Sequence, residues 1–493
     1  MSGAGEGCST PKASGHLAVA GAPWVVRPVL RRDGRIFVLK CMSPSAPEPP
    51  GKDPYVALRV PSYRWFLLGS FVSNIGRQAV GLAAAWQVYQ WTRSAAALGL
   101  IGLIHFLPYV FLALPAGQLA DRHNRRRILQ VSLVGTILTS LGLVIAAARP
   151  EMIPAWGPFA TINSAIGWLA SAFEIAGDAS QLRFDEPALA VVFLLLFLGA
   201  IIRTISNPAR ATIVPLLLPK EHLTNAITWS TSAFEISSMV GPALAGFLIA
   251  WGGFAAAYTL DVAAGIAFAA MLFGVRYVEP SKPTEARTWR SLGAGASFIW
   301  RNKTILAASS LDLFAVLLGG AIALLPVYAE EILKVGPVGL GWLRAAPAIG
   351  AAAMALTLAY LPPIRRPGVV LLWTVAGFGA AIIGFGLSTW FWLSFVMLLL
   401  TGVFDNVSVV IRQTLVQLLT PDHLRGRVTA VNQIFIVSSN EVGGFRAGTM
   451  ASMFGPVVAT VAGGVGTVLV VVGVARLFPG LRSLRKLHEL SPE

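Results

Sequence analysis

Twelve long apolar segments occupy most of this 493-residue chain, and they constrain its fold more than any other feature. Each is roughly twenty residues long, the length that an α-helix needs to cross the hydrocarbon core of a bilayer. Only 12% of the residues are charged, against about 25% in soluble domains, so the composition argues against a water-soluble globule. The sequence predicts an all-α polytopic membrane protein. Its spans begin near Trp65, Ala95, Ile128, Ala188, Leu223, Phe254, Ile305, Gly339, Gly368, Phe391, Val428 and Pro456.

The formal net charge of +15 would suit a nucleic-acid-binding protein, but the position of the charges matters more than their sum. Sixteen lysines and arginines fall in the connections on one side of the predicted spans. Only four, Arg93, Arg149, Arg183 and Lys334, fall on the other side. Because positively charged loops stay in the cytoplasm, both termini are predicted to be cytoplasmic, in the inner membrane of a bacterium. The basic excess therefore follows from membrane topology, and no nucleic-acid partner is expected.

Residues 1–64 are rich in glycine, proline and serine, and their longest apolar stretch is interrupted by Gly21 and Pro23. Such a composition is typical of a disordered segment, so we expect a disordered cytoplasmic tail. Met42 is a plausible alternative start, in which case residues 1–41 are a translation artefact. Residues 478–493 are predicted to form a second cytoplasmic tail.

An internal repeat organises the spans into two halves. Residues 210–219 (RATIVPLLLP) match residues 412–421 (RQTLVQLLTP) at six of ten positions, with an offset of 202. Earlier in each half the offset is 239, which pairs Tyr89 with Tyr328 and Gly102 with Gly341. The difference of 37 residues corresponds to an insertion in the outer connection at about 149–187. The repeat predicts six-helix halves at 65–275 and 304–477 in the same orientation, joined by a cytoplasmic linker at 276–303 with a surface helix.

The segment 117–128 (GQLADRHNRRRI) resembles the signature loop between the second and third helices of the major facilitator superfamily. In that family the loop is a gate that stabilises the outward-facing state. The resemblance implies this role for Gly117, Asp121, Arg122, Arg125 and Arg126. The alternative, a solvated positive loop, accounts for the arginines but not for the glycine and the aspartate at their spacing.

One position departs from the family pattern of this loop, because Asn124 stands where a glycine is usual. Asparagine tolerates left-handed backbone conformation, so we expect the turn to be kept.

Residues 62–477 are similar to the branch of that superfamily that contains the enterobactin exporter and macrolide efflux proteins. Gly241, Pro242 and Gly246 resemble an antiporter signature in which glycine and proline bend a helix and allow close packing. A packing kink with no link to antiport is the alternative reading.

Charged side chains inside the spans are the candidates for function, because a charge at bilayer depth is costly and is retained to face a cavity or a partner. Five arginines and five acids occupy such positions, so complete pairing is an alternative to function. The repeat relates Arg203 to Asp405, and we expect these residues to face each other across the substrate path. A static buried ion pair is the rival reading. We expect Arg210 and Arg412, also related by the repeat, to tie down loops.

On the first span Asn74, Arg77, Gln78 and Gly81 recur at helical spacing and form one polar stripe, which is expected to face the cavity. Asn406, beside Asp405, completes the predicted substrate-cavity residues. Burial favours the neutral form of a carboxyl group and a nearby arginine the charged form, so buried acids can carry protons. The candidate proton carriers are Asp312, Glu235, Asp405 and Glu441, each with a packing role as its alternative. His105 is expected to pack.

These features predict a secondary active transporter that exports a small organic molecule, a siderophore or a drug-like compound, by alternating access coupled to protons. Uptake, or flipping of a lysolipid, is the alternative within the same fold. A non-transporting membrane scaffold or a membrane enzyme is the alternative of another class. The chain lacks a phosphate-binding loop, so no nucleotide is expected as partner. No cofactor and no metal are predicted, since Cys8 and Cys41 both lie in the tail.

Overall fold

The computed structural model describes residues 24–30, 36–42, 53–153, 157–173, 183–184, 186–277, 289–362 and 364–482. It contains two compact units, Met1–Val56 and Ala57–Glu493, and each is described by itself. Residues 483–493 of the predicted C-terminal tail lie outside the described residues.

The first unit contains an antiparallel hairpin of strands β1 (Trp24–Leu30) and β2 (Ile36–Met42), with Trp24 opposite Met42. This differs from the disorder expected for residues 1–64. The physical reason is local: both strands are rich in valine, leucine and isoleucine, residues that favour extended structure.

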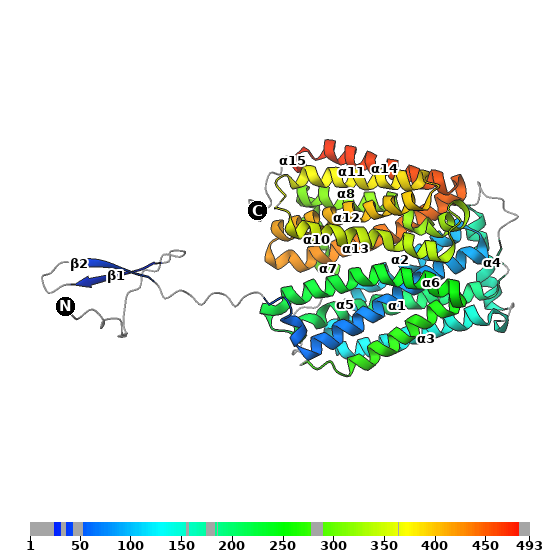
Figure 1. Ribbon diagram of the computed structural model, residues 1–493, viewed down its shortest axis with the longest axis horizontal. Coiled ribbons are helices and arrows are strands. Elements are labelled where there is room, and N and C mark those ends of the chain that lie inside the picture. Colours follow the sequence, from blue (N-terminus) through cyan, green and yellow to red (C-terminus); the bar gives the residue numbers. More distant parts are fainter. Residues whose placement is uncertain are drawn as a thin grey trace. The chain divides into compact units, whose positions relative to one another are not determined.

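The second unit is a helical bundle in which α4 and α15 lie at opposite ends (Figure 1). These two ends are called the α4 end and the α15 end. The α-helices are α1 (Pro61–Thr92), α2 (Ala95–Arg122), α3 (Arg125–Ala148), α4 (Pro158–Ser171), α5 (Ala188–Leu217), α6 (Leu223–Leu272), α7 (Trp289–Arg301), α8 (Lys303–Gly319), α9 (Leu325–Val327), α10 (Gly336–Tyr360), α11 (Pro367–Leu387), α12 (Phe391–Leu419), α13 (Asp422–Phe454), α14 (Pro456–Leu477) and α15 (Pro479–Arg482). Short 3-10 turns are η1 (Ala57–Arg59), η2 (Pro150–Met152), η4 (Lys220–His222) and η5 (Ala321–Leu324), and η6 (Tyr328–Ile332) is a π-helical turn.

Within the described ranges, nine helices are long and apolar enough to cross a membrane. One of them, α6, contains two spans, because Gly252 and Gly253 leave the helical conformation and Gly253 adopts a φ of 69°. Another runs from α8 to η6 as one interrupted span. The long helices α1 and α13 are more polar and are not among the nine. Counting α6 twice and adding α1 and α13 is consistent with the twelve predicted spans.

Two further helices lie where the repeat predicts extra sequence. The insertion expected at 149–187 contains α4, and residues 154–156, 174–182 and 185 of it lie outside the described part. The linker at 276–303 contains α7, which packs against α13. Residues 278–288 of this linker also lie outside the described part.

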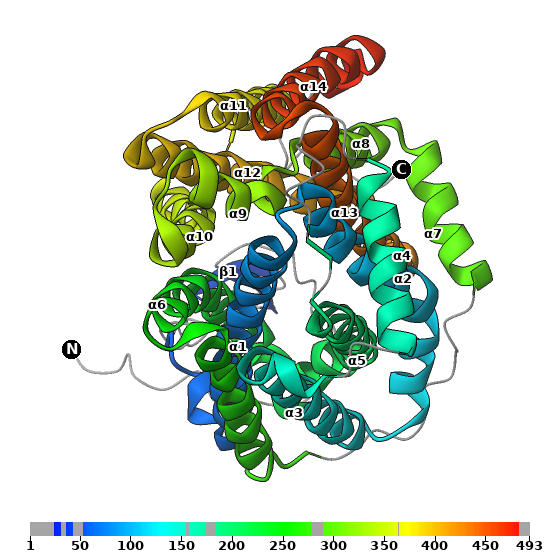
Figure 2. The ribbon, with the colours of Figure 1, turned by 90° about the vertical axis from the view of Figure 1, so that its right-hand side faces the viewer.

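The two halves share a core at the α4 end and have separate cores at the α15 end. The shared core includes Leu98 and Ala245 of the first half and Leu340 and Ala447 of the second. Towards the α15 end, one core contains first-half residues such as Leu129, and another contains second-half residues such as Leu311. Contacts between the halves run along α6 with α10 and α2 with α13 (Figure 2).

Glycines bring the two halves closest together at the α4 end. A Cβ atom on Gly246 would lie 3.2 Å from the Cα of Gly341, and one on Gly448 would lie 2.6 Å from the Cα of Gly99. Such small residues allow helix backbones to approach closely in membranes. Gly246 and Gly448 are separated by 202 residues, so the repeat places equivalent glycines at both contacts. The bundle is therefore closed at the α4 end.

Candidate functional site

The second half contains a buried charged cluster of one arginine and two aspartates. Arg412 of α12 forms an ion pair with Asp312 of α8, and each of these side chains is only 9% exposed. A second aspartate, Asp405, lies two turns before Arg412 on the same face of α12, with Oδ1 4.0 Å from Arg412 Nη2, and its side chain is 49% exposed. One arginine thus serves two carboxylates, one buried and one half-exposed.

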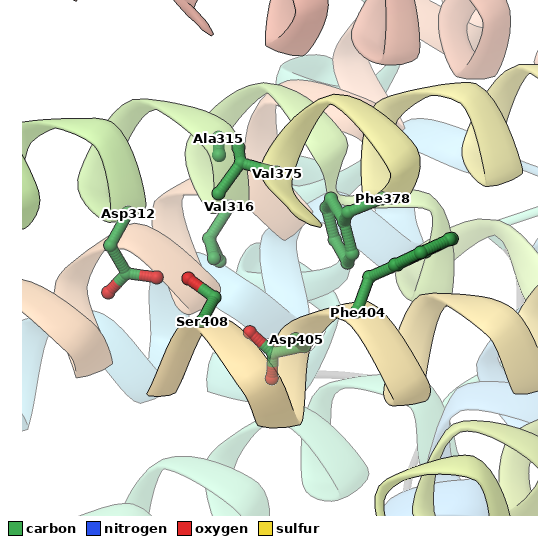
Figure 3. Close-up of a pocket in the computed structure, with 8 residues that line it drawn as sticks. All are labelled: Asp312, Ala315, Val316, Val375, Phe378, Phe404, Asp405 and Ser408. Atoms are coloured by element: carbon green, nitrogen blue, oxygen red, sulfur yellow. The ribbon is translucent and has the colours of Figure 1, made fainter. Parts of the chain in front are cut away.

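A small pocket of about 10 Å³, room for about one water molecule, adjoins this cluster (Figure 3). Its lining combines both aspartates with Ser408, whose hydroxyl lies between them, and with the rings of Phe378 and Phe404. Arg412 Nε also donates to the Ser408 carbonyl at 3.3 Å. The site joins two acids to a pocket with apolar walls.

The first half contains a second cluster of charged side chains, in which arginines outnumber acids. Arg77 of α1 donates to Asn74 at 2.6 Å, and Arg210 of α5 donates to Ser73 at 3.3 Å. The positive charges of Arg203 and Arg210 both act on Arg77. Nearby, Asp261 of α6 accepts from the Ser140 hydroxyl of α3 at 2.6 Å.

The predicted polar stripe on α1 is partly exposed, and that it faces a substrate cavity stays a prediction. Asn74, Arg77 and Gln78 are neither fully buried nor fully exposed, and Gly81 has open space where a side chain would lie.

The predicted contact between Arg203 and Asp405 does not occur in this structure, where each residue has other neighbours. Arg203 lies near Arg77, and Asp405 lies beside Arg412. Their meeting across the substrate path stays a prediction for another conformation. Asn406 lies on α12 with its Oδ1 buried and without a hydrogen-bond partner.

The expectation that Arg210 and Arg412 tie down loops is wrong, because both side chains point into the helix bundle. Arg412 pairs with Asp312, and Arg210 reaches Ser73 and lies 5.0 Å from the ring centre of Phe268. Sequence spacing placed them near helix ends but could not give the direction of such long side chains.

The other two predicted proton carriers lie between the halves. Glu441 of α13 has its Oε2 3.6 Å from Nδ1 of His105 on α2, and its charge acts on Arg344 of α10. His105, expected to pack, thus faces a carboxylate of the other half. Glu235 of α6 is close enough to Asp405 for their charges to interact.

The predicted gating loop lies at the α15 end, where α2 ends at Arg122 and α3 begins at Arg125. Gly117 is buried, Asp121 is partly exposed, and the backbone N–H of Arg126 donates to the Tyr277 hydroxyl at 3.1 Å. Asn124 does not adopt the expected left-handed conformation: its φ is −62°, and its side chain caps α3 by accepting from the Arg127 N–H.

The predicted packing motif on α6 makes close contacts on two sides. A Cβ on Gly241 would lie 2.6 Å from the Cβ of Gln78 on α1. The carbonyl of the next residue, Pro242, and Gly246 both approach Gly341 of α10. The motif therefore packs α6 both within its own half and against the other half.

The sequence reasoning missed a polar contact between the halves at the α4 end. Arg93, at the end of α1, forms a 3.0 Å ion pair with Glu330, and Tyr89 donates a hydrogen bond to Glu331. Both acids lie in the π-helical turn η6, a type of turn that is frequent at functional sites. A sequence signal for this contact existed. Two adjacent acids, Glu330 and Glu331, end a predicted span on the outer side of the membrane, where Arg93 is one of only four predicted basic residues.

Comparisons with known proteins agree with this architecture. Residues 66–444 match the sequence profile of the Major Facilitator Superfamily. The Enterobactin exporter EntS of Shigella boydii serotype 18 is 25% identical over 434 residues, which cover 88% of this chain and 95% of that protein. EntS of Escherichia coli O1:K1 shows the same identity and coverage.

Solved structures show the same fold at low sequence identity. A bacterial homologue of the human lysosomal transporter Spinster has a TM-score of 0.60 and 17% identity, over 90% of this chain and 100% of that one. A D-xylose-proton symporter has a TM-score of 0.61 and 12% identity, over 87% of this chain and 99% of that one. The profile match spans most of the chain, and this multi-pass membrane transporter belongs to the Major Facilitator Superfamily.

Proposed function

We propose that this protein exports a small organic molecule from the cytoplasm in exchange for protons, by alternating access. The observation that carries the proposal is the sharing of Arg412 by Asp312 and Asp405 beside a pocket. Similarity to proteins named enterobactin exporters supports the direction of transport and makes enterobactin the first substrate to test.

The distribution of positive charge supports the orientation. The loop between α2 and α3, with Arg122, Arg125, Arg126 and Arg127, lies at the α15 end. By the positive-inside rule this end is cytoplasmic, as both termini then are, in the inner membrane. The shared core at the α4 end and the divided cores at the α15 end then correspond to a conformation open to the cytoplasm.

Proton binding can control the charged cluster through simple electrostatics. A proton on either aspartate removes one negative charge next to Arg412 and weakens that contact. Arg412 then interacts mainly with the other carboxylate. Protonation of Asp312 weakens the link between α8 and α12, whereas protonation of Asp405 leaves Arg412 to Asp312 and strengthens that link. Such a two-state contact can bias the equilibrium between conformations open to the two sides. Transport is proposed as the sole activity, with protons and substrate as its partners, and with neither nucleotide nor nucleic acid.

The test is proton flux in proteoliposomes that contain the purified chain and a pH-sensitive dye, with enterobactin added to one side. We expect enterobactin-dependent flux that is lost in Asp312→Asn and in Asp405→Asn. The matched control is Glu221→Gln, which removes an exposed acid from η4 and should leave the flux unchanged.

Other outcomes would contradict separate parts of the proposal. Enterobactin movement without proton flux would contradict proton coupling. Movement into the space equivalent to the cytoplasm, in vesicles of known orientation, would contradict export. Movement of a lysolipid in place of enterobactin would contradict the proposed class of substrate.

A further inference from the structure

The arginine cluster of the first half has more positive charge than its surroundings compensate. Arg77, Arg203 and Arg210 share this region with one carboxylate, Asp261, which packs against Gly76 of α1. The formal balance of the cluster is three positive charges against one negative charge. Uncompensated charge at membrane depth is costly and is typically kept for a ligand or an ion.

The hydrogen bonds of these residues sharpen the imbalance. Arg77 and Arg210 donate to the neutral side chains of Asn74 and Ser73, and the Nε of Arg210 is buried without a partner. Asp261 accepts from Ser140. A negatively charged group would form charge-assisted hydrogen bonds with these guanidinium groups, roughly twice as strong as bonds between neutral groups.

The repeat shows that the imbalance is specific to this half. Arg210 and Arg412 are equivalent at the offset of 202, and Ser73 and Asp312 are equivalent at the offset of 239. The same arginine therefore reaches the same position of the first helix in each half, where it meets a hydroxyl in one and a carboxylate in the other. Arg203 likewise corresponds to Asp405. The first half has an arginine where the second half has an acid.

A continuous partly exposed face of α5 connects this cluster to an open hollow. Arg203, Asn207, Ala211 and Val214 follow one another at helical spacing and are all accessible to some degree. The last two line an open hollow of about 300 Å³ together with Ser230, Thr231 and Phe234 of α6. A ligand that enters from the α15 end can thus reach the arginines along α5.

We propose that the arginine cluster is the substrate-binding site and that it selects an organic anion with an aromatic or apolar body. The guanidinium groups of Arg77 and Arg203 bind the acidic group, and the apolar lining of the hollow accommodates the rest. Protons and substrate thereby use different halves of the molecule. This inference rests on the proposed transport function and specifies the charge of the substrate.

The test uses two dyes that share a xanthene skeleton and differ in charge, anionic carboxyfluorescein and cationic rhodamine 6G. Binding to the purified full-length chain in lipid nanodiscs is measured by fluorescence anisotropy. We expect carboxyfluorescein to bind at least about tenfold more tightly than rhodamine 6G, and more weakly as salt is raised, because salt screens the charges.

The variants separate charge from structure. Arg203→Gln should weaken carboxyfluorescein binding about tenfold, whereas Arg203→Lys, which keeps the charge, should retain most of it. The thermal unfolding midpoint of each variant, measured in the same nanodiscs, controls for misfolding. Glu221→Gln serves as a variant remote from the cluster.

Three results would overturn the inference. They are equal or tighter binding of the cation, no binding of the anion, and anion binding that Arg203→Gln leaves unchanged. None of these binding results decides whether enterobactin drives proton flux in the wild-type protein, so the flux measurement tests the transport function separately. Loss of that flux, with the charge preference retained, would overturn proton-coupled export and leave the anion site in place.

Discussion

The two halves of this transporter share a repeated helical framework but differ in charge at two equivalent positions. In the second half Arg412 meets Asp312 and Asp405, so the cluster carries a formal charge of minus one. In the first half Arg210 meets Ser73, and Arg203 stands where the other half has Asp405. A duplicated framework thus carries one acidic and one basic cluster, which differ at two equivalent positions. We propose that the acidic cluster handles protons and that the basic cluster binds an anion.

The largest expected effect comes from making the second half resemble the first. Asp312→Ser removes the main partner of buried Arg412 and leaves it only the longer contact with Asp405, and breaking a buried ion pair costs about 3 kcal/mol of stability. Substrate-dependent proton flux should fall roughly a hundredfold, because the shared contact disappears. The measurements are the proteoliposome proton flux and the thermal unfolding midpoint. Retained flux at wild-type level would remove Asp312 from the proton pathway.

The converse change makes the first half resemble the second. Ser73→Asp places a carboxylate within reach of Arg210, so it competes with a bound anion. Carboxyfluorescein binding should weaken about tenfold, equivalent to about 1.4 kcal/mol. The control is Ser73→Asn, because asparagine has nearly the same size as aspartate but carries no charge. If both variants bind equally well, the charge of this position has no part in recognition.

The smallest expected effect concerns the contact between the halves at the α4 end. Arg93→Gln breaks the ion pair with Glu330, whose side chains are 37% and 26% exposed. A pair this exposed is worth about 0.5 kcal/mol, so the population open at the α4 end should rise roughly twofold.

Electron–electron distance measurements test this shift, with spin labels at Met152 and Trp390, exposed residues of the two halves. The control Arg149→Gln removes an exposed positive charge from the same end without touching Glu330. An unchanged distance distribution in Arg93→Gln would show that glycine packing alone keeps this end closed.

Much of the architecture could be predicted because it depends on local and periodic features of the chain. The spans follow from apolar length, and the halves follow from the matches around Arg210 and Arg412. The polar stripe of Asn74, Arg77 and Gln78 follows from helical spacing. The hairpin of β1 and β2 was not predicted, because the glycine and proline that are frequent in residues 1–64 favour disorder and outweigh two short apolar runs.

The partners within the candidate site were harder to predict. Helical periodicity places a residue on a face, but it does not state which helix that face meets. The repeat relates Arg203 to Asp405 as positions in the sequence, yet each residue lies in its own half beside other partners. His105 and Glu441 meet only because α2 and α13 pack against each other across the halves.

By itself the sequence determined that this is a membrane protein of two related halves with charged residues inside its spans. Those properties depend on hydrophobic length, on residue spacing and on the duplication, all of which are written along the chain. Only the tertiary structure decided that Arg412 is shared by two aspartates while Arg210 meets a hydroxyl. Long side chains sample many directions, and helix packing fixes which atoms come within the few ångströms over which hydrogen bonds and ion pairs act.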